Sequence, residues 1–164
     1  KDAEQSLRKT IELKPDFFQA HSALGGLLGE LGNLQKAELS TRKAIEINHD
    51  FADAHYNLGI ILSDLEKLQD AEISYRRAID IKPDFAEAHS NLGVLLKELG
   101  KLQDAEISYR KAIDIKPDFS KAHYNLGNVL RNLGKFKEAR LCSEKMMSLK
   151  PWSILGSYSF NYQM

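Results

Sequence analysis

Apolar residues recur three and four positions apart through most of the chain, a spacing that predicts amphipathic α-helices. In the stretch 86–119 this spacing predicts one helix over about 86–99 and a second over about 102–115. The apolar set of the first helix is Ala88, Leu92, Leu95, Leu96 and Leu99. The apolar set of the second helix is Ala105, Ile107, Tyr109, Ala112, Ile113 and Ile115.

Residues that begin or end helices stand at the limits of both predicted helices. Asp84, followed three residues later by Glu87, predicts a capping box at the start of the first helix. Gly100 suits the left-handed backbone at the end of that helix. Pro117 stops the second helix because proline cannot donate the next helical hydrogen bond. The stretch therefore predicts a helix–turn–helix unit.

This unit repeats along the chain with a period of 34 residues. Residues 86–119 are identical to residues 52–85 at 26 of 34 positions, and weaker copies occupy 18–51 and 120–153. Self-similarity at a fixed period of this size predicts supersecondary units stacked into a solenoid. We divide the chain into a half repeat (1–17, second helix only), four repeats (18–51, 52–85, 86–119 and 120–153) and an irregular, aromatic C-terminal tail (154–164).

The unit resembles the tetratricopeptide repeat (TPR) in its pattern of small and apolar residues. The matching positions are Leu92, Gly93, Leu96, Gly100, Ala105, Tyr109, Ala112 and Pro117. His89 replaces the large first aromatic residue of the pattern. The resemblance implies an all-α right-handed superhelix, with first helices lining the concave face and second helices forming the convex face.

One glycine recurs in the middle of each first helix, although glycine there costs about 1 kcal/mol relative to alanine. A cost repeated at this period suggests close approach of a neighbouring helix. We expect the partners to be the recurrent alanines of the second helices. The glycines are Gly25, Gly59, Gly93 and Gly127, and the alanines are Ala37, Ala71, Ala105 and Ala139.

Asn57, Asn91 and Asn125 form a second series at the repeat spacing. Each is expected on the side of a first helix opposite the glycine, which suggests the concave surface. An amide side chain can pair with a peptide backbone without reading its sequence. The motif of residues 89–93, His-Ser-Asn-Leu-Gly, is similar to the superhelical arm of O-linked N-acetylglucosamine transferases, in which such a row occurs. The alternatives are hydrogen bonds between neighbouring helices or simple exposure to solvent.

Further candidate contacts for an extended peptide flank the asparagine row. Tyr56, Ser90 and Tyr124 lie one residue before the asparagines, Lys121 lies near the start of its helix, and Asn128 lies further along. The middle repeats offer acidic residues along the groove and the last repeat offers Lys121. A peptide with a basic part over the middle repeats would suit this gradient.

Composition excludes several other functions. The formal net charge is zero and 28% of the residues are charged, which gives no case for nucleic acid or an anionic membrane. No apolar run approaches the roughly 20 residues of a membrane span. The single cysteine, Cys142, allows no intrachain disulfide, so we expect a reducing, cytoplasmic location.

We predict no enzyme activity and no cofactor, since no catalytic or phosphate-binding motif occurs. His21, His55, His89 and His123 recur once per repeat. Stacked helices would hold them too far apart to share a metal ion, so we expect them to pack between paired helices with a hydrogen bond.

The sequence leaves three functions open. The first is a protein-interaction scaffold that holds an extended segment in its concave groove. The second is the substrate-recruiting arm of a larger enzyme such as a glycosyltransferase. The third is self-association through unpaired ends or through the tail 154–164, where Tyr158, Phe160 and Tyr162 alternate as in an extended strand.

Overall fold

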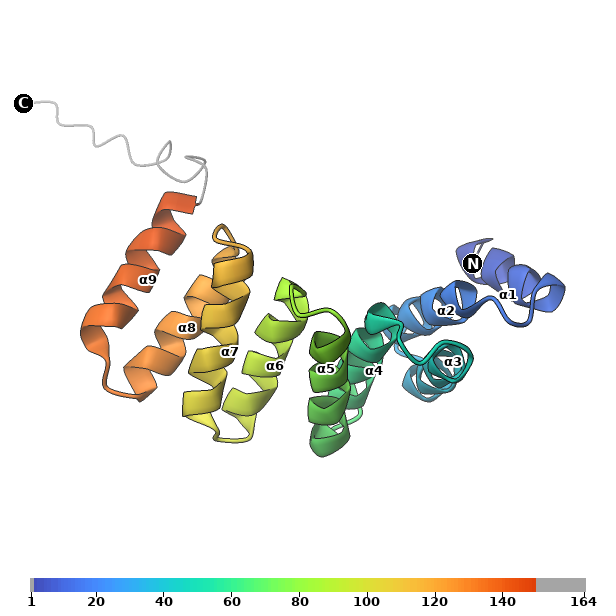
Figure 1. The fold of residues 1–164 in the computed structure, drawn as a ribbon, viewed down its shortest axis with the longest axis horizontal. Coiled ribbons are helices and arrows are strands. Elements are labelled where there is room, and N and C mark those ends of the chain that lie inside the picture. Colours follow the sequence, from blue (N-terminus) through green and yellow to red (C-terminus); the bar gives the residue numbers. More distant parts are fainter. Residues whose placement is uncertain (1, 150–164) are drawn as a thin grey trace, which may run out of the picture.

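The computed structural model describes residues 2–149, and their regular secondary structure is entirely α-helical. The tail predicted at 154–164 lies outside the described residues. The helices follow one another along a curved row, with α1 and α9 at opposite ends (Figure 1). Their bounds are α1 Asp2–Leu13, α2 Phe18–Glu30, α3 Leu34–Ile47, α4 Ala52–Asp64, α5 Leu68–Ile81, α6 Ala86–Glu98, α7 Leu102–Ile115, α8 Ser120–Asn132 and α9 Phe136–Leu149.

The first helix of each pair ends in a residue with left-handed backbone. Gly32, Gly100 and Gly134 have φ between 74° and 75° at this position. Gly100 N donates to Lys97 O, and the following amide reaches back to Leu96 O, which closes the end of α6. At the corresponding position in the second pair, Glu66 adopts φ 58°. A residue with a Cβ is strained there by about 1 kcal/mol, so this turn is less favourable than its glycine counterparts.

The start of α6 differs from the predicted capping box. The residue that precedes the helix is Phe85, and no side chain caps the first turn. Phe85 is buried, and its ring lies 4.7 Å from that of Tyr56 between centroids. The carboxylate of Glu87 accepts a hydrogen bond from Lys116 Nζ instead. Aromatic packing against the preceding repeat therefore fixes this helix start.

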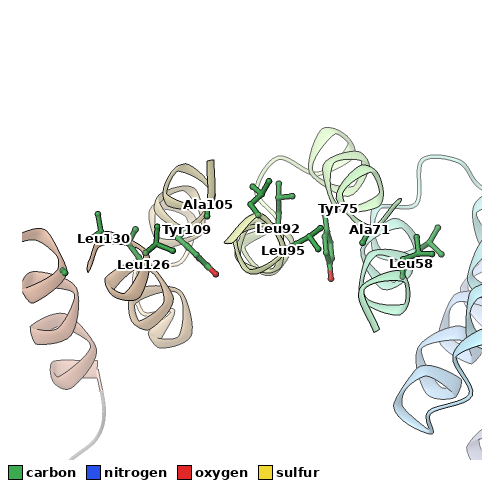
Figure 2. Close-up of a cluster of buried hydrophobic side chains, with 13 residues drawn as sticks. Leu58, Ala71, Tyr75, Leu92, Leu95, Ala105, Tyr109, Leu126 and Leu130 are labelled. Atoms are coloured by element: carbon green, nitrogen blue, oxygen red, sulfur yellow. The ribbon is translucent and has the colours of Figure 1, made fainter. Parts of the chain in front are cut away.

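A continuous apolar core joins α4 to α9. It contains leucines from the first helices and the rings of Tyr75 and Tyr109 from the second helices (Figure 2). An added Cβ at Gly59 would lie 2.6 Å from the ring of Tyr75, and one at Gly93 would lie 2.8 Å from the ring of Tyr109. The predicted close approach at these glycines is confirmed. In these two repeats, however, the nearest atoms belong to the tyrosines rather than to the expected alanines.

The stack bends because the two sets of helices are spaced differently. Each first helix contacts the next one, α2 with α4, α4 with α6 and α6 with α8. Among the described helices, the second helices α3, α5, α7 and α9 make no such contact with one another. Elements on the inner side of a bend lie closer together than those on the outer side. The first helices therefore form the inner, concave face and the second helices the outer, convex face.

Candidate functional site

Two adjoining pockets lie between successive first helices on the inner face. The smaller, about 200 Å³, lies between α2 and α4, and the larger, about 300 Å³, lies between α4 and α6 and reaches the start of α8. Both include Ile60 and Asp64, so they form one trough along the inner face. The smaller pocket is lined by Gly26, Gly29, Glu30, Asn57, Ile60, Ile61 and Asp64. The larger is lined by Ile60, Ser63, Asp64, Tyr75, Asn91, Val94, Leu95, Glu98 and Lys121.

Two of the three predicted asparagines line this trough, one in each pocket. Asn57 Nδ2 also lies 3.4 Å from Ser22 Oγ in the preceding repeat, and Asn91 Nδ2 donates to Tyr56 Oη at 3.1 Å. Both asparagines are half-buried and join neighbouring first helices. These contacts correspond to one of the alternatives stated for the asparagine row. No comparable hydrogen bond links Asn125 to another residue of the described chain.

Two buried hydroxyl oxygens of the third repeat, one on α6 and one on α7, lack a hydrogen-bond partner within the described residues. By the 34-residue period, Ser90 is the residue that corresponds to Ser22 and Tyr56, and so faces the position of Asn125. Within residues 2–149, the buried oxygens Ser90 Oγ and Tyr109 Oη have no hydrogen-bond partner. Figure 2 shows the hydroxyl oxygens of Tyr75 and Tyr109 on the same side of the row of helices. Burial raises the pKa of Tyr75 to about 12 and raises that of Tyr109 as well, so both hydroxyls remain protonated donors.

The other predicted contact residues occupy different environments. Tyr124 is 55% exposed, and Lys121 lines the larger pocket beside Glu98. Tyr56 is half-buried, with burial raising its pKa, while Ser90 is only 1% exposed. Asn128 accepts a hydrogen bond from Arg131 within α8. The structure thus brings Asn57, Asn91 and Lys121 to the trough and buries Ser90 beneath the surface.

The trough is predominantly acidic. The smaller pocket contains the carboxylates of Glu30 and Asp64 and no cationic side chain. The larger pocket contains Asp64 and Glu98 against one cation, Lys121. Carboxylates held beside amide groups and apolar walls favour cationic side chains with long aliphatic stems.

The recurrent histidines make structural hydrogen bonds within the chain. His21, His55, His89 and His123 each hydrogen-bond through Nε2 to a backbone carbonyl six residues earlier, at 2.8–3.0 Å. A carbonyl accepts, so each Nε2 carries the proton and ties the first helix to the preceding turn. Burial lowers the pKa of His55 and of His89, which favours the neutral ring. Among residues 2–149 no group of His, Cys, Asp or Glu side chains is arranged to hold a metal ion.

One residue of the predicted apolar sets faces solvent. Ile107 belongs to the apolar set predicted for its helix, but it is 66% exposed. The cause is geometric, because Ile107 lies on the outer side of α7, where no other second helix among those described contacts it. Exposed apolar residues recur at the same position of each second helix: Leu39, Ile73, Ile107 and Leu141. Their 34-residue spacing in the sequence marks them as a series. The apolar periodicity within one helix, however, does not distinguish such exposed positions from core positions.

No helix in the described part of the chain has the length and apolar character needed to cross a membrane.

Family models described as tetratricopeptide repeat match residues 18–51, 52–85, 86–119 and 108–141. Among solved structures, one described as MamA is similar with a TM-score of 0.81 and 25% identity, over 89% of this chain and 85% of that one. A MamA structure from Desulfovibrio magneticus RS-1 shares the fold at TM-score 0.80 and 22% identity, over 90% of this chain and 84% of that one. A structure of pilF from Pseudomonas aeruginosa has a TM-score of 0.75 and 28% identity, over 81% of this chain and 61% of that one. No curated protein sequence matches the chain.

Proposed function

Because the chain belongs to the tetratricopeptide repeat family and is a scaffold for protein–protein interaction, we propose that its inner trough binds an extended peptide carrying lysine or arginine side chains. The observation that carries this proposal is the pair of adjoining pockets between α2, α4 and α6. Each pocket combines carboxylates with one asparagine of the row. Cationic side chains of the peptide would enter beside Asp64, Glu30 and Glu98.

The amide groups supply the backbone contacts in this proposal. Asn57 and Asn91 are held in place by the preceding repeat, and each amide keeps its carbonyl oxygen for a peptide N–H. Asn125 has its whole amide available. Tyr124 and Asn128 extend the contact surface along α8.

Fluorescence anisotropy with labelled peptides tests the proposal. Peptides selected on the wild-type chain from a random display library should include a class rich in lysine and arginine. Asp64→Asn should weaken the binding of a selected peptide about tenfold, because hydrogen bonds to charged groups contribute about 1.5–3 kcal/mol. Asp80→Asn, on the outer face, is the matched control and should leave the affinity unchanged. A selection that yields no lysine- or arginine-rich class, or equal affinities of such a peptide for both variants, would contradict the assignment.

The similarity of residues 89–93 to the arm of O-linked N-acetylglucosamine transferases favours a second function, the recruitment of peptide substrates for an enzyme. It requires the same trough and the same amides. The two functions separate when the selected peptides are incubated with such a transferase joined to this chain. Any joined binder raises the local concentration of its peptide, so a recruiting arm is identified only if most of the selected peptides carry a serine or threonine acceptor and are modified there.

A further inference from the structure

The outer face carries three grooves that the peptide-binding trough does not use. They lie between α3 and α5, between α5 and α7, and between α7 and α9, with volumes of about 410, 320 and 350 Å³. The first is lined by Arg42, Ile45, Glu46, His55, Leu58, Ile73, Ser74 and Arg77. The second and third contain the residues 34 and 68 positions later, with conservative exchanges such as Asp80 for Glu46 and Leu141 for Ile73.

The bend of the stack explains why these grooves exist. The first helices touch one another on the inner side, so the second helices are spread apart on the outer side. The gap exposes part of the first helix behind it, and Leu58, Leu92 and Leu126 line the three grooves there. Histidines tied to the preceding turns complete the walls. The grooves are therefore built from the same helix positions in each repeat.

An exposed aliphatic side chain stands at the edge of every groove. Ile73 is 67% exposed and Leu141 is 63% exposed, and Ile107 lies between them in the series. Single exposed apolar residues are common on protein surfaces and need no explanation. Here they stand in register with three apolar grooves and add little to the core. Repeated apolar edges beside apolar grooves are typical of a docking surface.

The charges around the grooves point to the chemistry of the partner. Each groove is lined by two cationic side chains and one carboxylate: Arg42, Arg77 and Glu46 in the first, then Arg76, Lys111 and Asp80, then Arg110, Lys145 and Asp114. Nearby, Glu38 is shared by Arg42 and Lys67, and Glu72 by Arg76 and Lys101. Each groove lining keeps two cations to one carboxylate. Asp50 pairs with Arg77 at the first groove and Glu138 pairs with Arg110 at the third, so the positive excess is largest beside the second groove.

We propose that the outer face of α3, α5, α7 and α9 binds an acidic segment of another protein. Aliphatic side chains of that segment enter the grooves beside Ile73, Ile107 and Leu141. Its carboxylates pair with the cations that line the grooves, principally Lys111. The inner trough is acidic, whereas each outer groove is lined by two cations and one carboxylate, so the two faces select segments of opposite charge and can be occupied together.

A display selection with a counter-selection tests this surface independently of the inner trough. A random peptide library is selected on the wild-type chain and counter-selected on the double variant Ile73→Glu, Ile107→Glu. Both isoleucines are exposed, so the variant should keep its helical circular dichroism and its melting transition. Peptides that bind only the wild-type chain should combine leucine or isoleucine with aspartate and glutamate.

Synthetic versions of these peptides are then measured by anisotropy. Lys111→Glu should weaken their binding at least about tenfold, and added salt should weaken it further. Asp64→Asn, on the inner face, should leave it unchanged. The proposal is overturned if the counter-selection yields no acidic class, or if Asp64→Asn rather than Lys111→Glu removes binding. It is also overturned if sedimentation shows self-association that the double variant abolishes, because the face would then belong to a second copy.

Discussion

The inner and outer faces of this solenoid are made by the same repeat, yet they differ in contacts and charge. On the inner face, first helices touch and asparagines bond across them, at 3.1 Å between Asn91 and Tyr56. On the outer face, second helices stand apart, and ion pairs such as that of Lys101 with Glu72 connect one repeat to the next. The comparison shows that the bend closes the inner side and opens the outer one, while different residues of the same unit make the trough acidic and line each outer groove with two cations and one carboxylate.

The largest effect on stability is expected at the contact between the first and second helix of one repeat. Gly93→Ala would place a Cβ 2.8 Å from the ring of Tyr109, a side chain with no exposed surface. The ring cannot yield easily, so the free energy of unfolding should fall by about 1–3 kcal/mol in spite of the better helix former. Denaturant unfolding measures the change.

Gly127→Ala is the matched control for that substitution. The nearest atom to its added Cβ is Cys142 Cβ at 3.5 Å, an ordinary van der Waals distance. This variant should gain up to about 1 kcal/mol of stability from helix propensity. Equal effects of the two substitutions would show that the tight tyrosine contact does not hold the two helices of a repeat together.

An intermediate effect is expected from the inner face. A double-mutant cycle with Asn91→Ala and Tyr56→Phe should give a coupling energy of about 0.5–1.5 kcal/mol, the usual contribution of one hydrogen bond. Asn125→Ala, which breaks no bond between repeats, should change the free energy of unfolding by less than about 0.5 kcal/mol. A coupling near zero would mean that the amides of the first helices do not join the repeats.

The smallest effect is expected from the outer face. Lys101→Gln should cost about 0–1 kcal/mol, and less in high salt, because the ion pair with Glu72 is at the surface. The hydrogen bond from Lys101 is the main reason that the pKa of Glu72 lies below its ordinary value of 4.5. The folded chain therefore binds fewer protons there than the unfolded chain, and this stabilisation is complete above pH 4.5.

Stability from this carboxylate should then decline as the pH falls below 4.5. Lys101→Gln should make that decline shallower, as unfolding at neutral and acidic pH in low salt would show. A decline as steep as that of the wild-type chain would assign the pH dependence to other groups.

Several features were predictable because they depend on residues close together in the chain. Gly100 ends α6 as expected, because a left-handed turn there favours glycine regardless of what packs around it. The close approach at Gly59 and Gly93 was predictable because a glycine inside a helix is unfavourable, and its recurrence in every repeat indicated a packing reason. The histidines were expected to make a structural hydrogen bond, and each reaches a carbonyl only six residues away.

Other features depended on neighbours one repeat away. The start of α6 rests on Phe85 packing against Tyr56, where local rules favoured a carboxylate cap at Asp84 and Glu87. The partner of Asn91 is a tyrosine 35 residues earlier. Ile107 fits the apolar period of its helix and is nevertheless exposed, because the period does not say which apolar positions meet another helix.

The sequence by itself determined the helices, the glycine turns that close first helices and the 34-residue period, since hydrophobic spacing and turn residues act over a few positions. The tertiary structure decided which side of each helix is inner and which is outer, because that depends on how residues a full repeat apart fit together. Glycine and tyrosine set the distance between paired helices, while contact between first helices closes the inner side and opens the outer one.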